Sequence, residues 1–227
     1  MATTVIGTRE IRPVRFWDST NGQKAVMATT GVILLLFVFF HMLGNLQIFE
    51  GPEQLNYYGA ALRRFAEALW AARAILLIAV LLHIWSSVKL AVRKTSARPD
   101  GYAHRKNVNS SYASRTMYWS GPILLAFVIY HLLHMTTGTV HPNFQEGHPY
   151  ENVVAGFQVW YVSAWYIFSM ILLGLHIRHG AWSAFQSLGA NHPRHTPVLK
   201  KAAMTIAILV TAGYISIPVA VMLGLVR

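Results

Sequence analysis

The chain has 227 residues, of which 54% are hydrophobic and 12% are charged, and its net charge is +11. Soluble domains carry about 25% charged residues, so this composition predicts an integral membrane protein. The basic residues lie between long apolar runs, which indicates membrane topology and argues against nucleic-acid binding. The absence of cysteine excludes disulfides, thiolate metal sites and cysteine-ligated iron–sulfur clusters, so a cofactor would be bound by imidazole.

Five apolar stretches predict an all-α fold with five transmembrane helices. A polar arm over residues 1–24 precedes a transmembrane domain over residues 25–227, and a basic loop is expected over residues 93–115. Gly189 is predicted to cap the fourth helix, and Thr196 is predicted to be the N-cap of the fifth. A helix needs about 20 apolar residues to cross a bilayer. The predicted helices cover about residues 25–48, 67–93, 116–139, 153–186 and 202–226.

The basic residues also predict the orientation of the chain. Five spans put the two termini on opposite sides of the membrane. Fifteen of the 19 lysines and arginines fall on the side of the N-terminus, including those at the adjoining helix ends. Because cytoplasmic loops are enriched in lysine and arginine, we expect the N-terminus in the cytoplasm and the C-terminus outside.

Four of the five predicted helices carry a histidine inside the apolar run: His41, His83, His131 and His176. An unsatisfied polar group at that depth costs several kcal/mol, so each is a candidate functional residue. His41 and His131 lie past the midpoints of outward-running helices, on the outer half. His83 and His176 lie past the midpoints of inward-running helices, on the inner half. This layering predicts two bis-histidine haems stacked in a four-helix bundle.

A weak internal repeat supports the pairing of His41 with His131. Residues 30–43 read TGVILLLFVFFHML and residues 120–133 read SGPILLAFVIYHLL, at a constant offset of 90. Four glycines could give a porphyrin room against the helices or could serve ordinary helix packing. They are Gly31, Gly44, Gly121 and Gly174.

Alternatives remain for these histidines. A single intramembrane histidine can hydrogen-bond a neighbouring helix. Zinc is disfavoured because each layer offers two of four ligands, and a proton relay would favour intramembrane acids. His134 and His179 are rotated by only about 60° from the preferred residues, but the repeat favours His131, and Arg178 puts His179 nearer the interface. Five other histidines are expected in solvated loops or subunit contacts: His104, His141, His148, His192 and His195.

Four stretches of the chain resemble the cytochrome b membrane-anchor subunit of succinate:quinone oxidoreductases. This family includes succinate dehydrogenases and fumarate reductases, and the likeness is to its single-polypeptide, five-helix, two-haem kind. The fourth stretch, LHIRHGAWSAFQSLGANHPRHTP, is the most specific. The stretches are Gly31–Asn45 with FxxxHMLGNL, Leu82–Pro99 with KLAVRKTSARP, Ser114–Met117 leading to His131, and Leu175–Pro197.

The resemblance implies a role for the chain in electron transport. His41 and His131 would ligate the distal, outer haem b, and His83 and His176 the proximal, inner one. A flavoprotein subunit would oxidise succinate, and an iron–sulfur subunit on the cytoplasmic face would pass electrons through the haems to quinone. Menaquinone is expected rather than ubiquinone. The expected location is the bacterial cell (inner) membrane, in a complex of the tricarboxylic acid cycle and respiratory chain that could itself oligomerise.

The chain departs from the family at one position, and the sequence also predicts quinone-binding and propionate-binding residues. Some relatives carry a proton-conducting glutamate two residues before the last haem ligand, where this chain has Gly174. A quinone site is predicted at the outer side, with an inner competitor near Lys24, Thr30 and Trp182. The outer set is Tyr57, Arg64, Glu67 and Trp70, and residues predicted to contact haem propionates or partner subunits are Arg93, Arg115, Arg178, His134 and His179.

The sequence is also compatible with two other functions. The chain could be the cytochrome b subunit of a hydrogenase or formate dehydrogenase, whose partners usually sit outside the membrane. It could also be a haem-free membrane anchor or transporter.

Overall fold

The computed structural model describes residues 15–97 and 111–227, and these residues form helices without any strand. Five helices are long and apolar enough to cross a membrane, which confirms the predicted all-α membrane fold. Two shorter helices, α2 (Pro52–Arg64) and α5 (Pro149–Phe157), and two 3₁₀ turns, η1 (Phe16–Asp18) and η2 (Gln47–Glu50), complete the described part. The spans are α1 (Thr20–Leu46), α3 (Ala66–Ser96), α4 (Tyr112–Met135), α6 (Trp160–Ser187) and α7 (Thr196–Met222).

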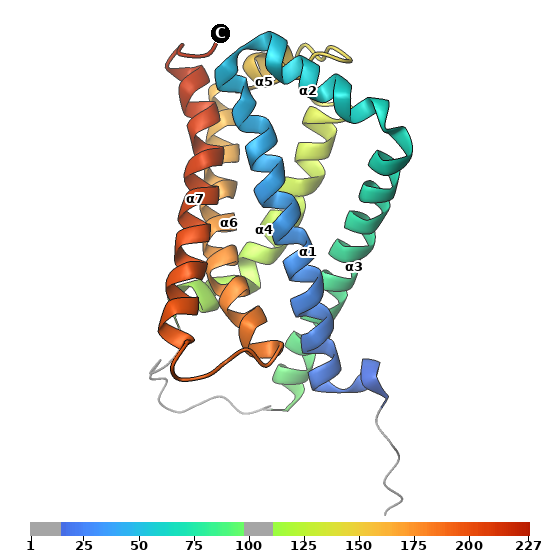
Figure 1. The fold of residues 1–227 in the computed structure, drawn as a ribbon, viewed down its shortest axis with the longest axis vertical. Coiled ribbons are helices and arrows are strands. Elements are labelled where there is room, and N and C mark those ends of the chain that lie inside the picture. Colours follow the sequence, from blue (N-terminus) through green and yellow to red (C-terminus); the bar gives the residue numbers. More distant parts are fainter. Residues whose placement is uncertain (1–14, 98–110) are drawn as a thin grey trace, which may run out of the picture.

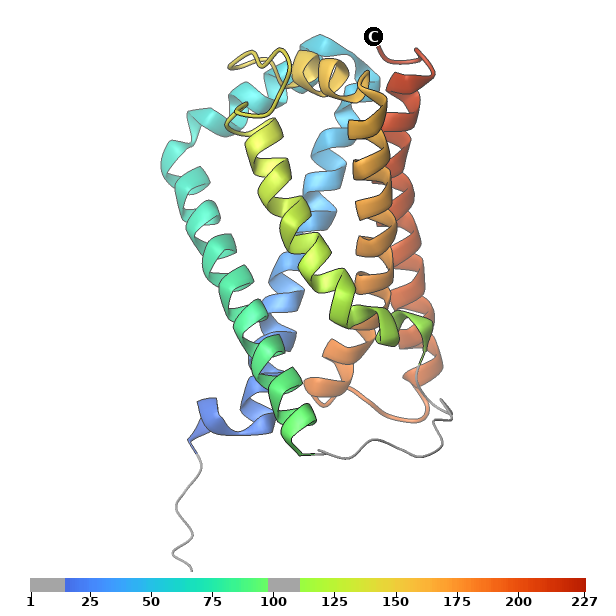
Figure 2. The ribbon, with the colours of Figure 1, turned by 180° about the vertical axis from the view of Figure 1, so that it is seen from behind.

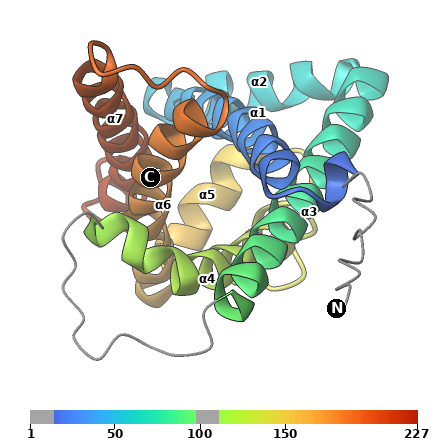
Figure 3. The same ribbon diagram turned by 90° about the horizontal axis from the view of Figure 1, so that it is seen from below.

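The five long helices run along the long axis of the molecule, and α2 and α5 lie across one end of the bundle (Figure 1). We call this end the α2–α5 end, and the other, where α1 begins, the N-terminal end. Seen along the axis, α1, α3, α4 and α6 surround the middle of the bundle, while α7 stands outside, against α6 (Figure 3). The four helices that carry the histidines therefore face one another.

The fifth span, α7, packs against α6 and α1. The hydroxyl of Tyr214 donates to the carbonyl of Val38 over 2.8 Å. The thioether of Met42 lies directly over Gly213, where a Cβ would clash. These contacts tie α7 to the same part of α1 that carries His41.

The predicted fourth helix, 153–186, is wrong as a single element. The chain breaks at Gln158 and Val159, so that α5 lies across the end of the bundle and α6 begins at Trp160. Val159 is extended, with ψ of 106°, and the hydroxyl of Ser163 donates to the carbonyl of Phe157 over 2.6 Å. The sequence contains no proline or charge at this break, and Gly156 lies two residues before it. The apolar pattern therefore continues across the break.

Other helix ends differ from the prediction by a few residues because side-chain caps set them. Ser19 accepts from the backbone N–H of Gly22 and starts α1 inside the predicted arm. Ser111 accepts from the N–H of Ser114 and starts α4 at Tyr112 instead of residue 116. Residues 1–14 of the arm and 98–110 of the basic loop lie outside the described residues.

Of the two predicted helix caps, the one at the end of α6 is confirmed and the one at the start of α7 is wrong. Gly189 has a φ of 80°, and its N–H bonds the carbonyl of Gln186 while that of Ala190 bonds Phe185. This is a Schellman cap, and it confirms the predicted role of Gly189. Thr196 is the first residue of α7 rather than its N-cap, which is His195. The Thr196 hydroxyl instead points back to the preceding turn, where its one proton is shared between Oδ1 of Asn191 and the carbonyl of His192.

Packing is uneven along the bundle. The larger buried cluster lies towards the α2–α5 end and includes Phe127 of α4, Phe157 of α5 and Tyr166 of α6. Helix α3, in contrast, buries only Ala79 and Ser86. Helix α4 crosses the bundle obliquely and bends near its start (Figure 2), and Pro122, which cannot donate a backbone hydrogen bond, lies in this part.

Candidate functional site

The structure brings the four intramembrane histidines together as two separate pairs. The rings of His41 (α1) and His131 (α4) have centroids 6.0 Å apart, and those of His83 (α3) and His176 (α6) lie 6.2 Å apart. The first pair is nearer the α2–α5 end, as the positions of its members in their helices require. Two imidazole nitrogens held at about 2 Å from one iron would place their ring centroids roughly 6 Å apart. Both separations therefore fit bis-histidine ligation.

His83 is held in the tautomer that a metal ligand needs. Its Nδ1 lies 3.1 Å from the carbonyl of Met27 and 3.2 Å from the hydroxyl of Thr30. A carbonyl only accepts, so Nδ1 carries the proton and donates it. In the neutral ring this leaves Nε2 with a free lone pair. Metal-bound histidines commonly make this second bond to a backbone carbonyl, which fixes the ring.

Helix α1 approaches His83 closely at a glycine. A Cβ on Gly31 would lie 3.3 Å from Cε1 of His83, tighter than an ordinary contact. The partner ring, His176, is half-buried, and its Nδ1 is buried without a hydrogen-bond partner among the described residues. The His83 ring is thus held by hydrogen bonds, whereas no such bond holds Nδ1 of His176 among the described residues.

The His41–His131 pair is fixed by different neighbours. Nδ1 of His131 lies 3.2 Å from the hydroxyl of Tyr166, and its ring stacks near Phe127 at a centroid distance of 5.8 Å. The His41 ring stacks on Phe37 at 5.2 Å. Asn45 donates to the carbonyl of His41 over 2.7 Å, and its amide nitrogen lies 3.4 Å from Nε2 of the same residue.

His134 is enclosed by protein, which distinguishes it from His131. His134 is 0% exposed, and its Nδ1 lies 3.1 Å from the hydroxyl of Tyr166. Its Nε2 faces Gly156, where an added Cβ would be 3.1 Å away. His131, in contrast, is half-buried. Because both nitrogens of His134 are covered, the structure favours His131 as the ligand, as the internal repeat predicts.

The expectation that His141 is solvated or lies at a subunit contact is wrong for this chain. His141 is buried, and its ring centroid lies 4.7 Å from that of His134. Its Nε2 donates to the carbonyl of Asn152 over 2.8 Å, while its Nδ1 accepts from the N–H of Asn143 over 3.1 Å. The loop after α4 therefore folds back over the α2–α5 end. Sequence patterns pointed to neither Tyr166 nor this loop contact.

The four glycines have different neighbours. Tyr58 packs onto Gly44, whose added Cβ would lie 2.6 Å from the Tyr58 hydroxyl, and Thr211 packs directly onto Gly174. At these two positions a protein side chain covers the glycine, which agrees with ordinary helix packing. Gly121 has no atom within 4 Å of an added Cβ. Thr211 also leaves no space for a glutamate at residue 174.

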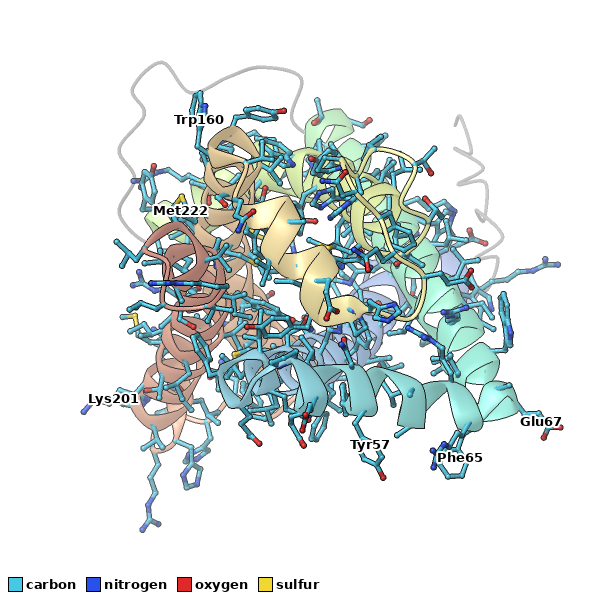
Figure 4. All side chains as sticks on the ribbon, turned by 90° about the horizontal axis from the view of Figure 1, so that it is seen from above. Tyr57, Phe65, Glu67, Trp160, Lys201 and Met222 are labelled. Carbon is cyan, nitrogen blue, oxygen red and sulfur yellow. The ribbon has the colours of Figure 1, made fainter. Side chains whose placement is uncertain are left out.

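The residues predicted to bind quinone do not form a pocket in this structure. All four of the outer set, Tyr57, Arg64, Glu67 and Trp70, are exposed, and Tyr57 and Glu67 point away from the bundle (Figure 4). Arg73 lies over the ring of Trp70 at 4.8 Å.

The inner competitor is also dispersed. Thr30 is buried with its hydroxyl against His83, and Lys24 is exposed. Lys200 lies 5.1 Å from the Trp182 ring centroid.

The arginines predicted to contact propionates or partners lie towards the N-terminal end. Arg93 donates to the backbone carbonyl of Asp18 and, over 3.3 Å, to Thr20, so it ties η1 and α1 to α3. Arg115 lies 5.9 Å from the ring of Tyr112. Arg178 is exposed, and His179 is half-buried one turn beyond His176.

Among the residues that the structure describes, no three histidine, aspartate or glutamate side chains gather as a metal site. The four intramembrane histidines lie in pairs. Two histidines are enough for one haem, because its porphyrin supplies the remaining iron ligands. No family model, curated protein or solved structure matches this chain.

Proposed function

We propose that this chain is the di-haem cytochrome b membrane anchor of a succinate:quinone oxidoreductase. The proposal rests on one observation: the four histidines form two pairs at two depths. The ring centroids are 6.0 Å apart in one pair and 6.2 Å apart in the other. Single structural histidines would not need to meet two by two across four helices. The motifs that resemble the family support the choice among cytochromes b.

Each pair has a defined task in this proposal. His83 and His176 would hold one haem b, and His41 and His131 the other. Bound haem takes up and releases one electron at a time. Met27 and Thr30 orient His83 through its Nδ1, and Phe37 and Phe127 flank the rings of the other pair. The surrounding apolar helices keep water away and lower the local dielectric constant.

The distribution of charge supports the direction of electron flow. The excess of lysine and arginine on the N-terminal side predicts that this side is cytoplasmic. A flavoprotein and an iron–sulfur subunit would dock there, in a bacterial cell membrane. Electrons would then reach the His83–His176 haem first and the His41–His131 haem second, before quinone, which we expect to be menaquinone.

Isolation of the complex through a tag on this chain tests the proposal. Anaerobic addition of succinate should reduce b-type haem in the preparation, and malonate, a competitive analogue of succinate, should block the reduction. Reduction by hydrogen or formate, without any response to succinate, would contradict the proposal and favour the rival cytochromes. A preparation without haem would leave the haem-free anchor.

A further inference from the structure

The hydroxyl of Tyr166 bridges two histidines of α4. Its oxygen lies 3.2 Å from Nδ1 of His131 and 3.1 Å from Nδ1 of His134. A phenol carries one proton, so it can donate to one of these nitrogens and must accept from the other. With both bonds made and both rings neutral, one ring carries its proton on Nδ1 and the other on Nε2.

The two arrangements have different consequences for His131. If Tyr166 donates to His131, the proton of that ring lies on Nε2, which then cannot bind a metal. If Tyr166 accepts from His131, the proton lies on Nδ1 and Nε2 has a free lone pair. In the second case the phenol proton goes to Nδ1 of His134, whose own proton then lies on Nε2, a buried nitrogen without a hydrogen-bond partner among the described residues.

We propose that Tyr166 is a positioning residue that selects the ligating tautomer of His131 and uses His134 as the acceptor of its own proton. The inference rests on the haem ligation proposed above. It assigns a role to His134 that is neither iron ligation nor contact with a propionate.

The surroundings of Tyr166 suit such a role. The residue is 6% exposed, and its ring lies edge-on against Phe127 at 5.0 Å and Phe157 at 4.8 Å. The His134 ring is stacked on Tyr130 at 5.4 Å, with 14° between the planes. A hydroxyl held by packing on both sides cannot easily swing away from its partners. Ligands whose second hydrogen bond is fixed in this way are oriented and made more basic.

The bond to Tyr166 should favour the oxidised state of the haem held by His131. An acceptor on Nδ1 makes the imidazole a better electron donor and stabilises ferric iron. Donation from Tyr166 to His134 makes the phenol oxygen a stronger acceptor, because linked hydrogen bonds polarise one another. Loss of the phenol oxygen should therefore raise the midpoint potential of this haem.

Redox titration of the isolated complex with Tyr166→Phe tests the proposal. We expect about a tenfold shift of the ferric–ferrous equilibrium towards ferrous, about 59 mV for a one-electron couple, at the His41–His131 haem alone. Tyr214→Phe is the matched control. This tyrosine ring lies 6.3 Å from that of His41, but its hydroxyl donates to the Val38 carbonyl and to no histidine. The midpoint potentials of both haems in Tyr214→Phe should equal those of the unmodified chain.

His134→Phe provides a second variant that keeps a ring against Tyr130. It should shift the same potential in the same direction by a smaller amount. Selective loss of the His41–His131 haem in Tyr166→Phe, with both haems kept in Tyr214→Phe, would also support the proposal.

Normal potentials in Tyr166→Phe with both haems bound would overturn the positioning role and leave the proposed function intact. If Tyr166→Phe loses both haems, an unchanged potential in His134→Phe overturns the role. Absence of haem from the unmodified complex would instead overturn the proposed function.

Discussion

At the His83–His176 pair a backbone carbonyl fixes the ring of one histidine, whereas at the His41–His131 pair a side-chain hydroxyl does so. The carbonyl of Met27 can only accept, so the tautomer of His83 follows from the main chain of α1. The hydroxyl of Tyr166 can donate or accept and is shared with His134. The first site is thus set by the fold, and the second depends on a side chain that a single substitution can remove.

The two pairs also differ in how the protein packs around them. The His41–His131 pair lies beside the large buried cluster that contains Phe127 and Tyr166. The His83–His176 pair uses α3, which is largely uncovered by other protein elements. Substitutions that change side-chain volume should therefore disturb the His41–His131 pair more than the His83–His176 pair.

The largest effects should come from removing a ligand. His131→Ala and His83→Ala should each lower the haem content from two to one per chain, because the pairs share no residue. Haem quantified against protein, followed by redox titration, would show which haem remains. His179→Ala, which removes a neighbouring imidazole on α6, should keep both. Loss of both haems from either ligand variant would contradict the independence of the two sites.

A packing change should separate the two regions. In Gly156→Ala the new Cβ would lie 2.7 Å from Cε1 of His134 and 3.2 Å from Nε2 of His141. Overpacking of this kind costs about 1–3 kcal/mol, so we expect earlier thermal unfolding and a disturbed spectrum of the His41–His131 haem. Gly180→Ala is the control, because no atom lies within 4 Å of its Cβ. Equal melting of the two variants would refute the tight contact.

The smallest effect should come from Thr30→Val, which removes the second acceptor of His83 and keeps the side-chain volume. Met27 still accepts from Nδ1, so the free energy of reduction of the His83–His176 haem should change by about 0.5 kcal/mol or less. Ser120→Ala tests the equivalent position of the repeat, where the buried hydroxyl has no partner among the described residues. It should be neutral. A larger shift for Thr30→Val than for Tyr166→Phe would reverse the comparison.

The sequence predicted the spans and the pairing for the same reason. Charge-free windows mark the helices, and a rise of about 1.5 Å per residue converts the position of each histidine into a depth. Alternating helix direction then brings His41 level with His131, and His83 level with His176. The break at Val159 has no such marker, because the residues on both sides are uncharged and compatible with a helix.

The partners of the histidines could not be predicted in the same way. Which side chain meets Nδ1 of His131 depends on the rotation of α6 about its axis. A helix that is apolar on all sides carries no stripe to set that rotation. Tyr166 therefore looked like any other residue of the span, and Thr30, expected near an inner quinone site, instead contacts His83.

The central claim is that each histidine pair holds one haem b. The direct measurement is the reduced-minus-oxidised absorption spectrum of the purified chain, with haem extracted and quantified as its pyridine adduct. The account predicts a b-type band at about 560 nm and two haems per chain. A purified, folded chain without that band would contradict it.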